Sequence, residues 1–270
     1  MLDRLGGRPA FDDLVDAVLK AGELGLKLFL EGAGARAEKK PDQSPVTEAD
    51  RAIEAQLSAF VEKRFPDACF YGEETGEGAS TPSSLRFIVD PIDGTRAFLR
   101  GMPTWSVLVG VEHDGLPIAG VAFMPASGDL FTAVSGHGAY ANGRPIRLSR
   151  VAALGDALIS HGALAQFTDT KQAGALVRLA EATYTQRGLG DFAGYRALLL
   201  GQADAVIDPG VQPYDVAAAA AIVREAGGRF SAIDGSETIY GPGAIASNGP
   251  LHDAIVALLN LAGESSLKSV

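Results

Sequence analysis

The stretch that decides the fold is FIVDPIDGTRAF, residues 87–98. An apolar, β-branched run ends at Asp90, Pro91 is expected to stop the strand, and Gly94 opens a short helix. Two carboxylates, Asp90 and Asp93, are therefore expected at a strand end, with a backbone carbonyl between them and amide groups beyond. Hard oxygen ligands beside a helix N-terminus are typical of a site where a divalent cation holds a phosphate.

A purely structural interpretation of this stretch exists, because Asp and Gly both favour turns and strands often end in such residues. Two further acidic positions favour the functional interpretation. Glu73-Glu74 follows a short apolar stretch, and Tyr214-Asp215 precedes a long Ala-rich helix. Acidic residues at the ends of several elements can converge on one site on a rigid scaffold.

Four ordered blocks of the sequence resemble the inositol-monophosphatase-like family of magnesium-dependent phosphatases. The blocks are PVTEAD at 45–50, GEE at 72–74, DPIDGT at 90–95 and PYDVAA at 213–218, the last followed by EAGG at 225–228. The tyrosine at 214 and the continuation TRAF at 95–98 look more like the histidinol-phosphate phosphatase branch than the inositol branch.

The hydrophobic periodicity predicts an α/β protein. Long helices are expected over 10–31 and 47–64, antiparallel strands between 105 and 148, and alternating strands and helices after 151. The resemblance implies an αβαβα sandwich. In that arrangement residues 1–150 form an N-terminal α+β lobe with most metal ligands, and residues 151–270 form a C-terminal α/β lobe that completes the metal and substrate site.

The resemblance also implies a set of metal ligands. Glu73, Asp90 and the backbone carbonyl of Ile92 would hold one Mg²⁺ ion. Asp90, Asp93 and Asp215 would hold a second, and two or three ions are expected in each active site.

The same resemblance assigns the catalytic and substrate-binding roles. Glu73 and Thr95 would orient the attacking water, and the amides of Gly94 and Thr95 would receive the phosphate. Asp50 would be an outer carboxylate near a third, weaker metal position. Lys40 occupies the family's lysine position in a charged loop near the metals.

Three acidic residues also have a simpler interpretation as helix caps. Asp50 is the third residue after Thr47, as in a capping box, and Asp215 begins the Ala-rich helix. Asp191 stands at the start of another predicted helix and is a plausible N-cap. The resemblance instead places Asp191 in the substrate pocket, against the part of the substrate that is not phosphate.

The amino-acid composition limits the kinds of molecule that the protein is expected to bind. A net charge of −10 argues against nucleic acid and against an anionic membrane surface. The single cysteine excludes an internal disulfide framework, and no apolar run reaches the length of a membrane span, so a cytoplasmic protein is expected. The resemblance adds a homodimer and sensitivity to lithium.

The protein is predicted to be a Mg²⁺-dependent phosphate monoester hydrolase that acts on a small phosphorylated substrate. L-Histidinol phosphate is the preferred candidate for that substrate. Inositol 1-phosphate, a sugar bisphosphate and an adenosine bisphosphate stay open, as does a non-catalytic, metal-binding regulatory relative. All four histidines lie outside the family blocks, which speaks against a phosphohistidine intermediate and against a zinc site built from imidazoles.

Overall fold

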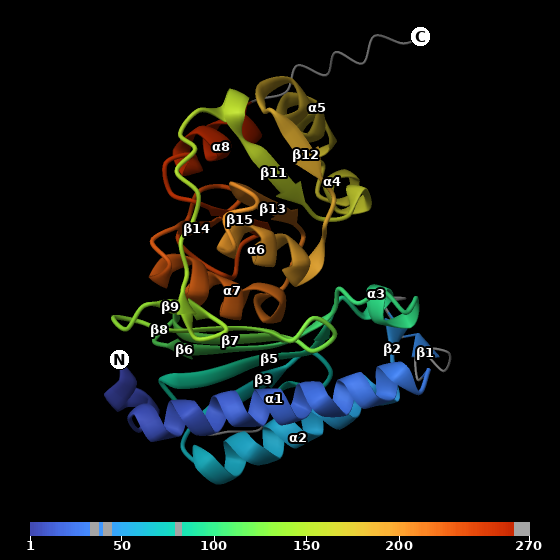
Figure 1. Ribbon diagram of the computed structural model, residues 1–270, viewed down its shortest axis with the longest axis vertical. Helices are drawn as coiled ribbons and strands as arrows, with labels where there is room; N and C mark the ends of the chain where they lie inside the picture. The colour runs from blue at the N-terminus through green and yellow to red at the C-terminus, as the bar shows by residue number, and fades with distance from the viewer. Residues whose placement is uncertain (33–37, 40–44, 79–82, 262–270) are drawn as a thin grey trace. The chain divides into compact units, whose positions relative to one another are not determined.

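The computed structural model describes residues 1–32, 38–39, 45–78 and 83–261 (Figure 1). The chain divides into two compact units that alternate along the sequence. Unit 1 comprises Met1–Ile146, Asp191–Ala193 and Pro213–Ala226, and unit 2 comprises Arg147–Gly190, Gly194–Gln212 and Gly227–Val270. Every predicted site residue that the structure describes belongs to unit 1.

Unit 1 is built on an eight-stranded sheet with the order β10-β9-β8-β7-β6-β5-β3-β4. The pair β3·β5 is parallel and the other neighbours are antiparallel, so the predicted antiparallel meander is confirmed. The strands are β3 Cys69–Gly72, β4 Gly76–Glu77, β5 Leu85–Asp93, β6 Ser106–His113, β7 Leu116–Met124, β8 Asp129–Val134, β9 Ala139–Ala141 and β10 Arg144–Pro145.

Two long helices, α1 Arg8–Leu30 and α2 Glu48–Arg64, cover one face of this sheet, and α7 Pro213–Glu225 covers the other (Figure 1). Helix α7 lies unusually close to the strands. A Cβ on Gly110 of β6 would lie 2.4 Å from Ala217 Cβ, and one on Gly120 of β7 would lie 2.4 Å from the Ala218 carbonyl oxygen. Small residues on both surfaces thus bring the N-terminal half of α7 close to the sheet.

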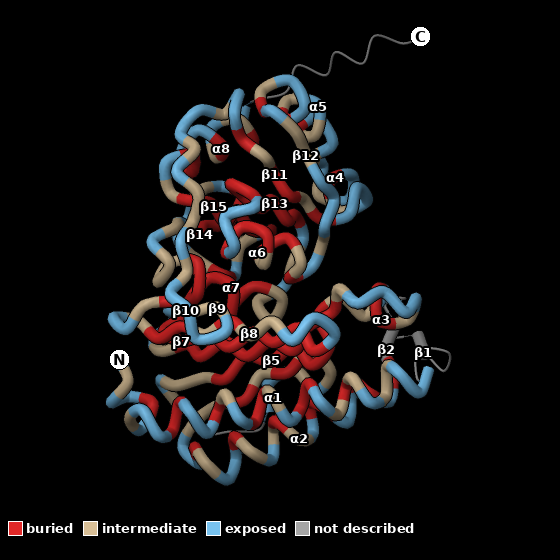
Figure 2. Tube along the Cα trace, viewed as in Figure 1, coloured by how far each residue is buried: buried red, intermediate tan, exposed pale blue. Residues whose placement is uncertain are grey.

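The remaining elements of unit 1 are short. A 3₁₀ turn, η1 Leu2–Leu5, precedes α1, and β1 Glu38–Lys39 pairs antiparallel with β2 Pro45–Val46. Helix α3 Thr95–Leu99 follows β5. The buried residues of the unit lie along the sheet and on the helix turns that pack against it (Figure 2).

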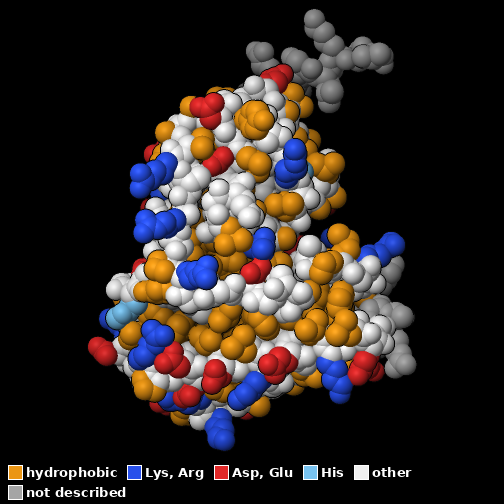
Figure 3. All heavy atoms as spheres, viewed as in Figure 1, with side chains coloured by type: hydrophobic (Ala, Val, Ile, Leu, Met, Phe, Trp, Pro, Cys, Tyr) orange, Lys and Arg blue, Asp and Glu red, His pale blue; other side chains and the backbone are white. Residues whose placement is uncertain are grey.

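The outer side of α1 is charged. Arg8 pairs with Asp12 and Lys27 with Glu31, each one helical turn apart. Acidic and basic side chains are interspersed there (Figure 3). Such exposed pairs keep the helix soluble and contribute little to stability.

Unit 2 contains a five-stranded mixed sheet with the order β12-β11-β13-β15-β14. Strand β11 is parallel to β12 and β13, whereas β15 is antiparallel to both of its neighbours. The strands are β11 Leu158–His161, β12 Thr185–Arg187, β13 Ala205–Pro209, β14 Arg229–Ala232 and β15 Gly243–Ser247. The helical segments are η3 Leu154–Asp156, α4 Leu164–Asp169, α5 Ala173–Ala182, α6 Asp191–Leu199 and α8 His252–Leu259, and the first residues of α6 belong to unit 1. The α/β class is confirmed.

One expectation about the central stretch is wrong, because β5 does not stop at Pro91 but continues to Asp93. Asp90 pairs with Leu108 and Asp93 with Ser106, so three steps along β5 match two along β6. This bulge leaves the proline outside the regular ladder, where its missing N–H costs nothing. The extra residue also lets Asp90 and Asp93 converge, although side chains three apart in a regular strand point to opposite faces.

None of the described helices is both long enough and apolar enough to cross a membrane.

Candidate functional site

An acidic cluster lies where the end of β5 meets the first turn of α7. Asp90, Asp93 and Asp215 each offer a carboxylate oxygen, and these oxygens all lie within 4.8 Å of one another. The Asp90 side chain is 2% exposed and that of Asp93 5% exposed. Three predicted ligands from segments more than a hundred residues apart are therefore brought together.

Asp90 is the member of this cluster with an unsatisfied oxygen. Burial raises the pKa of Asp90 well above its usual range, and the charges of Glu73, Asp93 and Asp215 raise it further. Among the described residues, the Oδ1 atom of Asp90 has no hydrogen-bond partner. A buried carboxylate oxygen without a partner, among like charges, costs free energy, and a divalent cation with hard oxygen preferences removes that cost. The donor set fits Mg²⁺.

Asp93 also accepts hydrogen bonds from two other segments of unit 1. Its Oδ2 accepts hydrogen bonds from the Ser106 hydroxyl at 2.7 Å and from the Phe192 amide at 2.8 Å. These bonds lower its pKa, but burial and the nearby charge of Asp191 dominate and raise it well above the usual range. Asp93 therefore holds the start of α6 as well as contributing to the acidic cluster.

The expected N-cap role of Asp191 is wrong. Gly190 is the N-cap residue of α6, and no side chain caps the helix from that position. Asp191 is the first helical residue, with a φ of 47°, and the neighbouring amide of Phe192 is bound by Asp93. The cap comes from a residue 99 positions away, so the Asp191 side chain is available for another role.

The Asp191 carboxylate lies against Gly94. A Cβ on Gly94 would lie 3.0 Å from Asp191 Oδ2, and the φ of 82° at Gly94 also favours glycine. Burial raises the pKa of Asp191, and the Arg96 guanidinium opposes the rise. The structure thus places two predicted substrate-binding residues side by side.

Asp50 is a helix cap, as its sequence position predicts. Thr47 and Asp50 form a complete capping box, in which Asp50 Oδ2 accepts the Thr47 amide at 2.8 Å. The other oxygen, Oδ1, is buried and lacks a hydrogen-bond partner among the described residues. Burial raises the pKa of Asp50, and the charge of Glu73 adds to the rise. The capping role is confirmed, and one oxygen of Asp50 remains without a hydrogen-bond partner among the described residues.

Glu73 follows β3 directly. Its amide donates to the Val89 carbonyl at 3.1 Å, which ties this position to β5. The charge of Glu73 raises the pKa of both Asp90 and Asp50. Glu73 therefore stands between the acidic cluster and the α2 N-terminus.

Thr95 and Ile92 interact directly, because the Thr95 hydroxyl donates to the Ile92 carbonyl oxygen at 3.0 Å. With its hydrogen engaged, the Thr95 oxygen can only accept from a further group. Lys40, the last predicted substrate-binding residue, lies outside the described residues.

Two residues around the cluster were missed by the sequence analysis. Ser106 donates to Asp93 from the opposite strand, and Glu54 of α2 accepts the amides of Glu74 and Thr75. The pairing of Ser106 with Asp93 depends on the bulge in β5, which no local sequence pattern indicates. Glu54 lies one turn after Asp50 on the same helix, and this spacing is the signal that could have found it.

The family is decided by a match over nearly the whole chain: the model of the inositol monophosphatase family matches residues 10–264. The chain belongs to this family. It is accordingly a phosphomonoesterase, and its histidinol-phosphatase relatives and the acidic cluster agree with that activity.

Proteins named for different activities are similar to this chain. The histidinol-phosphatase of Mycobacterium tuberculosis is 38% identical over 83% of this chain and 88% of its own. The inositol-1-monophosphatase of Mesorhizobium japonicum is 33% identical over 86% of this chain and 88% of its own. Among solved structures, the extragenic suppressor protein suhB from Bartonella henselae has a TM-score of 0.87 and 29% identity, and the match covers 95% of this chain and 100% of that one. The likeness supports the expected sandwich class of fold.

Proposed function

We propose that this phosphatase hydrolyses L-histidinol phosphate to L-histidinol and phosphate and requires Mg²⁺. The observation that carries the substrate proposal is the carboxylate of Asp191, which lies beside Gly94 and whose charge acts on Asp93 of the acidic cluster. Histidinol phosphate carries a cationic amine and an imidazole, which a carboxylate attracts. The identity to the Mycobacterium tuberculosis histidinol-phosphatase supports the same choice.

The metal ligands in this proposal are those of the acidic cluster and its neighbours. They are Asp90, Asp93, Asp215, Glu73 and the backbone carbonyl of Ile92, which together would hold two or three Mg²⁺ ions. Mg²⁺ held by these residues would supply positive charge that offsets the phosphate charge, makes a water more acidic and stabilises the leaving alkoxide.

The chain's own groups position the reactants. Glu73 accepts a hydrogen bond from the attacking water and then its proton. Thr95 Oγ1, whose hydrogen is held by the Ile92 carbonyl, accepts the water's other hydrogen and so fixes its orientation. The amides of Gly94 and Thr95 bind the phosphate, Asp50 supplies an outer carboxylate near Glu73, and Lys40 binds substrate from the preceding loop.

The leaving group would be recognised by Asp191. The Arg96 guanidinium acts on the same carboxylate, so the substrate ammonium would share Asp191 with Arg96. An amide at position 191 would lose the charge that selects a cationic leaving group but leave the metal ligands in place.

The test compares kcat/KM for L-histidinol phosphate and inositol 1-phosphate in wild type and Asp191→Asn. We expect wild type to prefer histidinol phosphate and the variant to lose about tenfold of that preference, while hydrolysis of a simple aryl phosphate stays within about twofold. A wild-type preference for inositol 1-phosphate of about tenfold, or roughly 1.4 kcal/mol, would overturn the substrate choice and leave the metal-dependent phosphatase intact.

The second candidate substrate is inositol 1-phosphate. It is favoured by the 33% identity to the Mesorhizobium japonicum inositol-1-monophosphatase. The same comparison of substrates decides between the two.

A further inference from the structure

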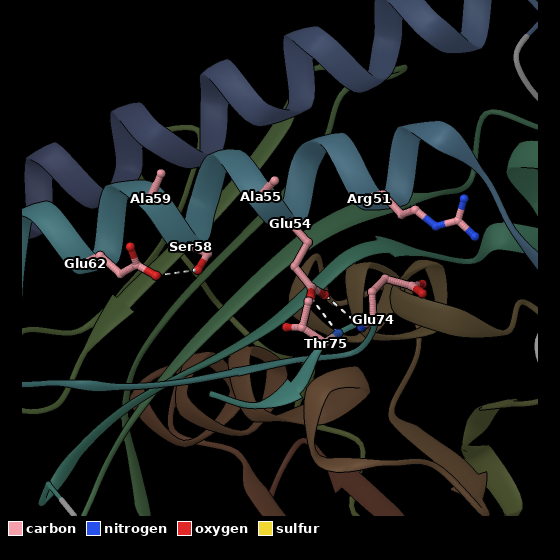
Figure 4. A pocket seen from close by; sticks show the side chains of 8 residues that line it. All are labelled: Arg51, Glu54, Ala55, Ser58, Ala59, Glu62, Glu74 and Thr75. Atoms are coloured by element: carbon pink, nitrogen blue, oxygen red, sulfur yellow. Dashed lines mark hydrogen bonds between the residues drawn. The ribbon is translucent and has the colours of Figure 1, made fainter. Parts of the chain in front are cut away.

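Glu54, in the middle of α2, lies against the segment that carries Glu73. Its side chain is 1% exposed. Glu54 Oε2 accepts the Glu74 amide and Oε1 accepts the Thr75 amide, both at 2.8 Å (Figure 4). Each carboxylate oxygen therefore holds one of the two backbone amides that follow Glu73.

The residue before Glu73 is fitted to the same carboxylate. A Cβ on Gly72 would lie 2.4 Å from Glu54 Cδ and 2.4 Å from Oε1. Only a glycine therefore allows the carboxylate to reach the turn in this position. Glu54 therefore contacts the chain on both sides of Glu73.

The Glu73 backbone is consequently held from two directions. Its own amide is bound to the Val89 carbonyl of β5, and the next two amides are bound to α2 through Glu54. Hydrogen bonds from backbone amides to a carboxylate are short and roughly twice as strong as neutral ones. This arrangement restricts where the Glu73 side chain can go.

The surroundings leave room for the turn to move if this restraint is lost. Glu54, Glu62 and Thr75 line a cavity of about 470 Å³ beside α2 (Figure 4). The turn at Glu74 and Thr75 therefore borders open space.

We propose that Glu54 is a positioning residue, which fixes Glu73 at the distance from Asp90 that catalysis and metal binding need. The inference rests on the proposed role of Glu73. Residues that support a ligating group in this way typically contribute about 10- to 100-fold to metal affinity or rate, and a displacement of about 1 Å in a catalytic group can cost about a hundredfold.

The sharpest variant is Glu54→Gln. Glutamine keeps the size of the side chain, but its nitrogen cannot accept a hydrogen bond, so one of the two amides is left without its acceptor. The matched control is Glu62→Gln, the same change on the same helix, whose carboxylate interacts with Ser58 Oγ at 3.4 Å (Figure 4). Gly72→Ala serves as a second test, because the new methyl group would displace the Glu54 carboxylate.

Three measurements on the full chain follow: kcat and KM for L-histidinol phosphate, Mg²⁺ affinity by calorimetry without substrate, and hydrogen exchange at the amides of Glu74 and Thr75. For Glu54→Gln we expect kcat to fall about tenfold or more with KM within about twofold, Mg²⁺ to bind more weakly, and at least one amide to exchange faster. Gly72→Ala should shift the same quantities in the same direction, and Glu62→Gln should match wild type.

Wild-type kcat and Mg²⁺ affinity in Glu54→Gln, with faster amide exchange, would overturn the inference. So would equal losses in Glu54→Gln and Glu62→Gln. A wild-type chain that releases phosphate from neither substrate would instead defeat the proposed function, and Mg²⁺ affinity with amide exchange would still decide the role of Glu54.

Discussion

Two buried aspartates, Asp90 in unit 1 and Asp204 in unit 2, differ in whether hydrogen bonds satisfy both of their carboxylate oxygens. Asp204 is 6% exposed, and its oxygens accept the Ser149 hydroxyl and, at 2.7 Å, the Leu158 amide. Asp90 is 2% exposed and stands among other carboxylates, with one oxygen lacking a hydrogen-bond partner among the described residues. A carboxylate that the protein satisfies holds the fold together, whereas one that it leaves unsatisfied is arranged for a ligand.

His252 extends the comparison to another buried group of unit 2. Its Nδ1 lies 3.0 Å from the Ser247 hydroxyl and its Nε2 lies 2.9 Å from the Ser231 hydroxyl, so both ring nitrogens have partners. Burial lowers its pKa to about 4. This imidazole is a neutral packing group that links β14, β15 and α8, and it has no free nitrogen to act in catalysis.

The largest expected effect is at Asp90. Asp90→Asn should lower Mg²⁺-dependent turnover by at least about a hundredfold, because the amide keeps the shape but removes a negative charge from the proposed metal site. Its free energy of unfolding without Mg²⁺ should be equal to or higher than that of wild type, since a buried like charge is gone. Urea unfolding in EDTA and phosphate release measure the two quantities. A marked loss of stability would mean that Asp90 is a structural carboxylate like Asp204.

Asp204 should show the opposite pattern. Asp204→Ala leaves the Leu158 amide without its acceptor, which should lower the free energy of unfolding by about 2–3 kcal/mol. The folded fraction should keep kcat within about twofold of wild type. Urea unfolding with activity measured at low denaturant checks this, and a catalytic loss at unchanged stability would break the distinction between the two aspartates.

The smallest effect is the pH dependence due to His252. The pKa of His252 is about 4 in the folded state, below the unfolded value of 6.5. The contribution of this neutral imidazole to the free energy of unfolding is therefore fully present above pH 6.5 and is lost as the pH falls toward 4. Between pH 8 and pH 5 wild type should lose on the order of 1–2 kcal/mol from this group. His252→Gln should lack that part of the pH dependence. Parallel stability curves for the two proteins would show that His252 is not the group responsible.

The elements and the acidic cluster could largely be predicted from local sequence. The capping box at Thr47 and the apolar run ending at Asp90 are local patterns, and the structure has both. The family blocks identified Asp90, Asp93 and Asp215 as one set, and the structure brings them together. These features depend on residues close in sequence or on a specific motif.

What could not be predicted depends on contacts between distant segments. The cap of α6 comes from Asp93, so the sequence around Asp191 suggested the wrong residue. The bulge at Pro91 is visible only through the register with β6. The close approach of α7 requires Gly110 and Gly120, whose role is defined only by the helix that packs on them.

The most direct test of the central claim, that the clustered carboxylates of unit 1 form a divalent-cation site for phosphoryl transfer, is a Mg²⁺ titration of the metal-free protein. Calorimetry and phosphate release should be recorded on the same samples of wild type and Asp90→Asn. We expect heat of binding and hydrolysis to rise together in wild type and both to be strongly reduced in the variant. Hydrolysis at full rate in EDTA, or equal Mg²⁺ binding and turnover by the folded variant, would contradict the account.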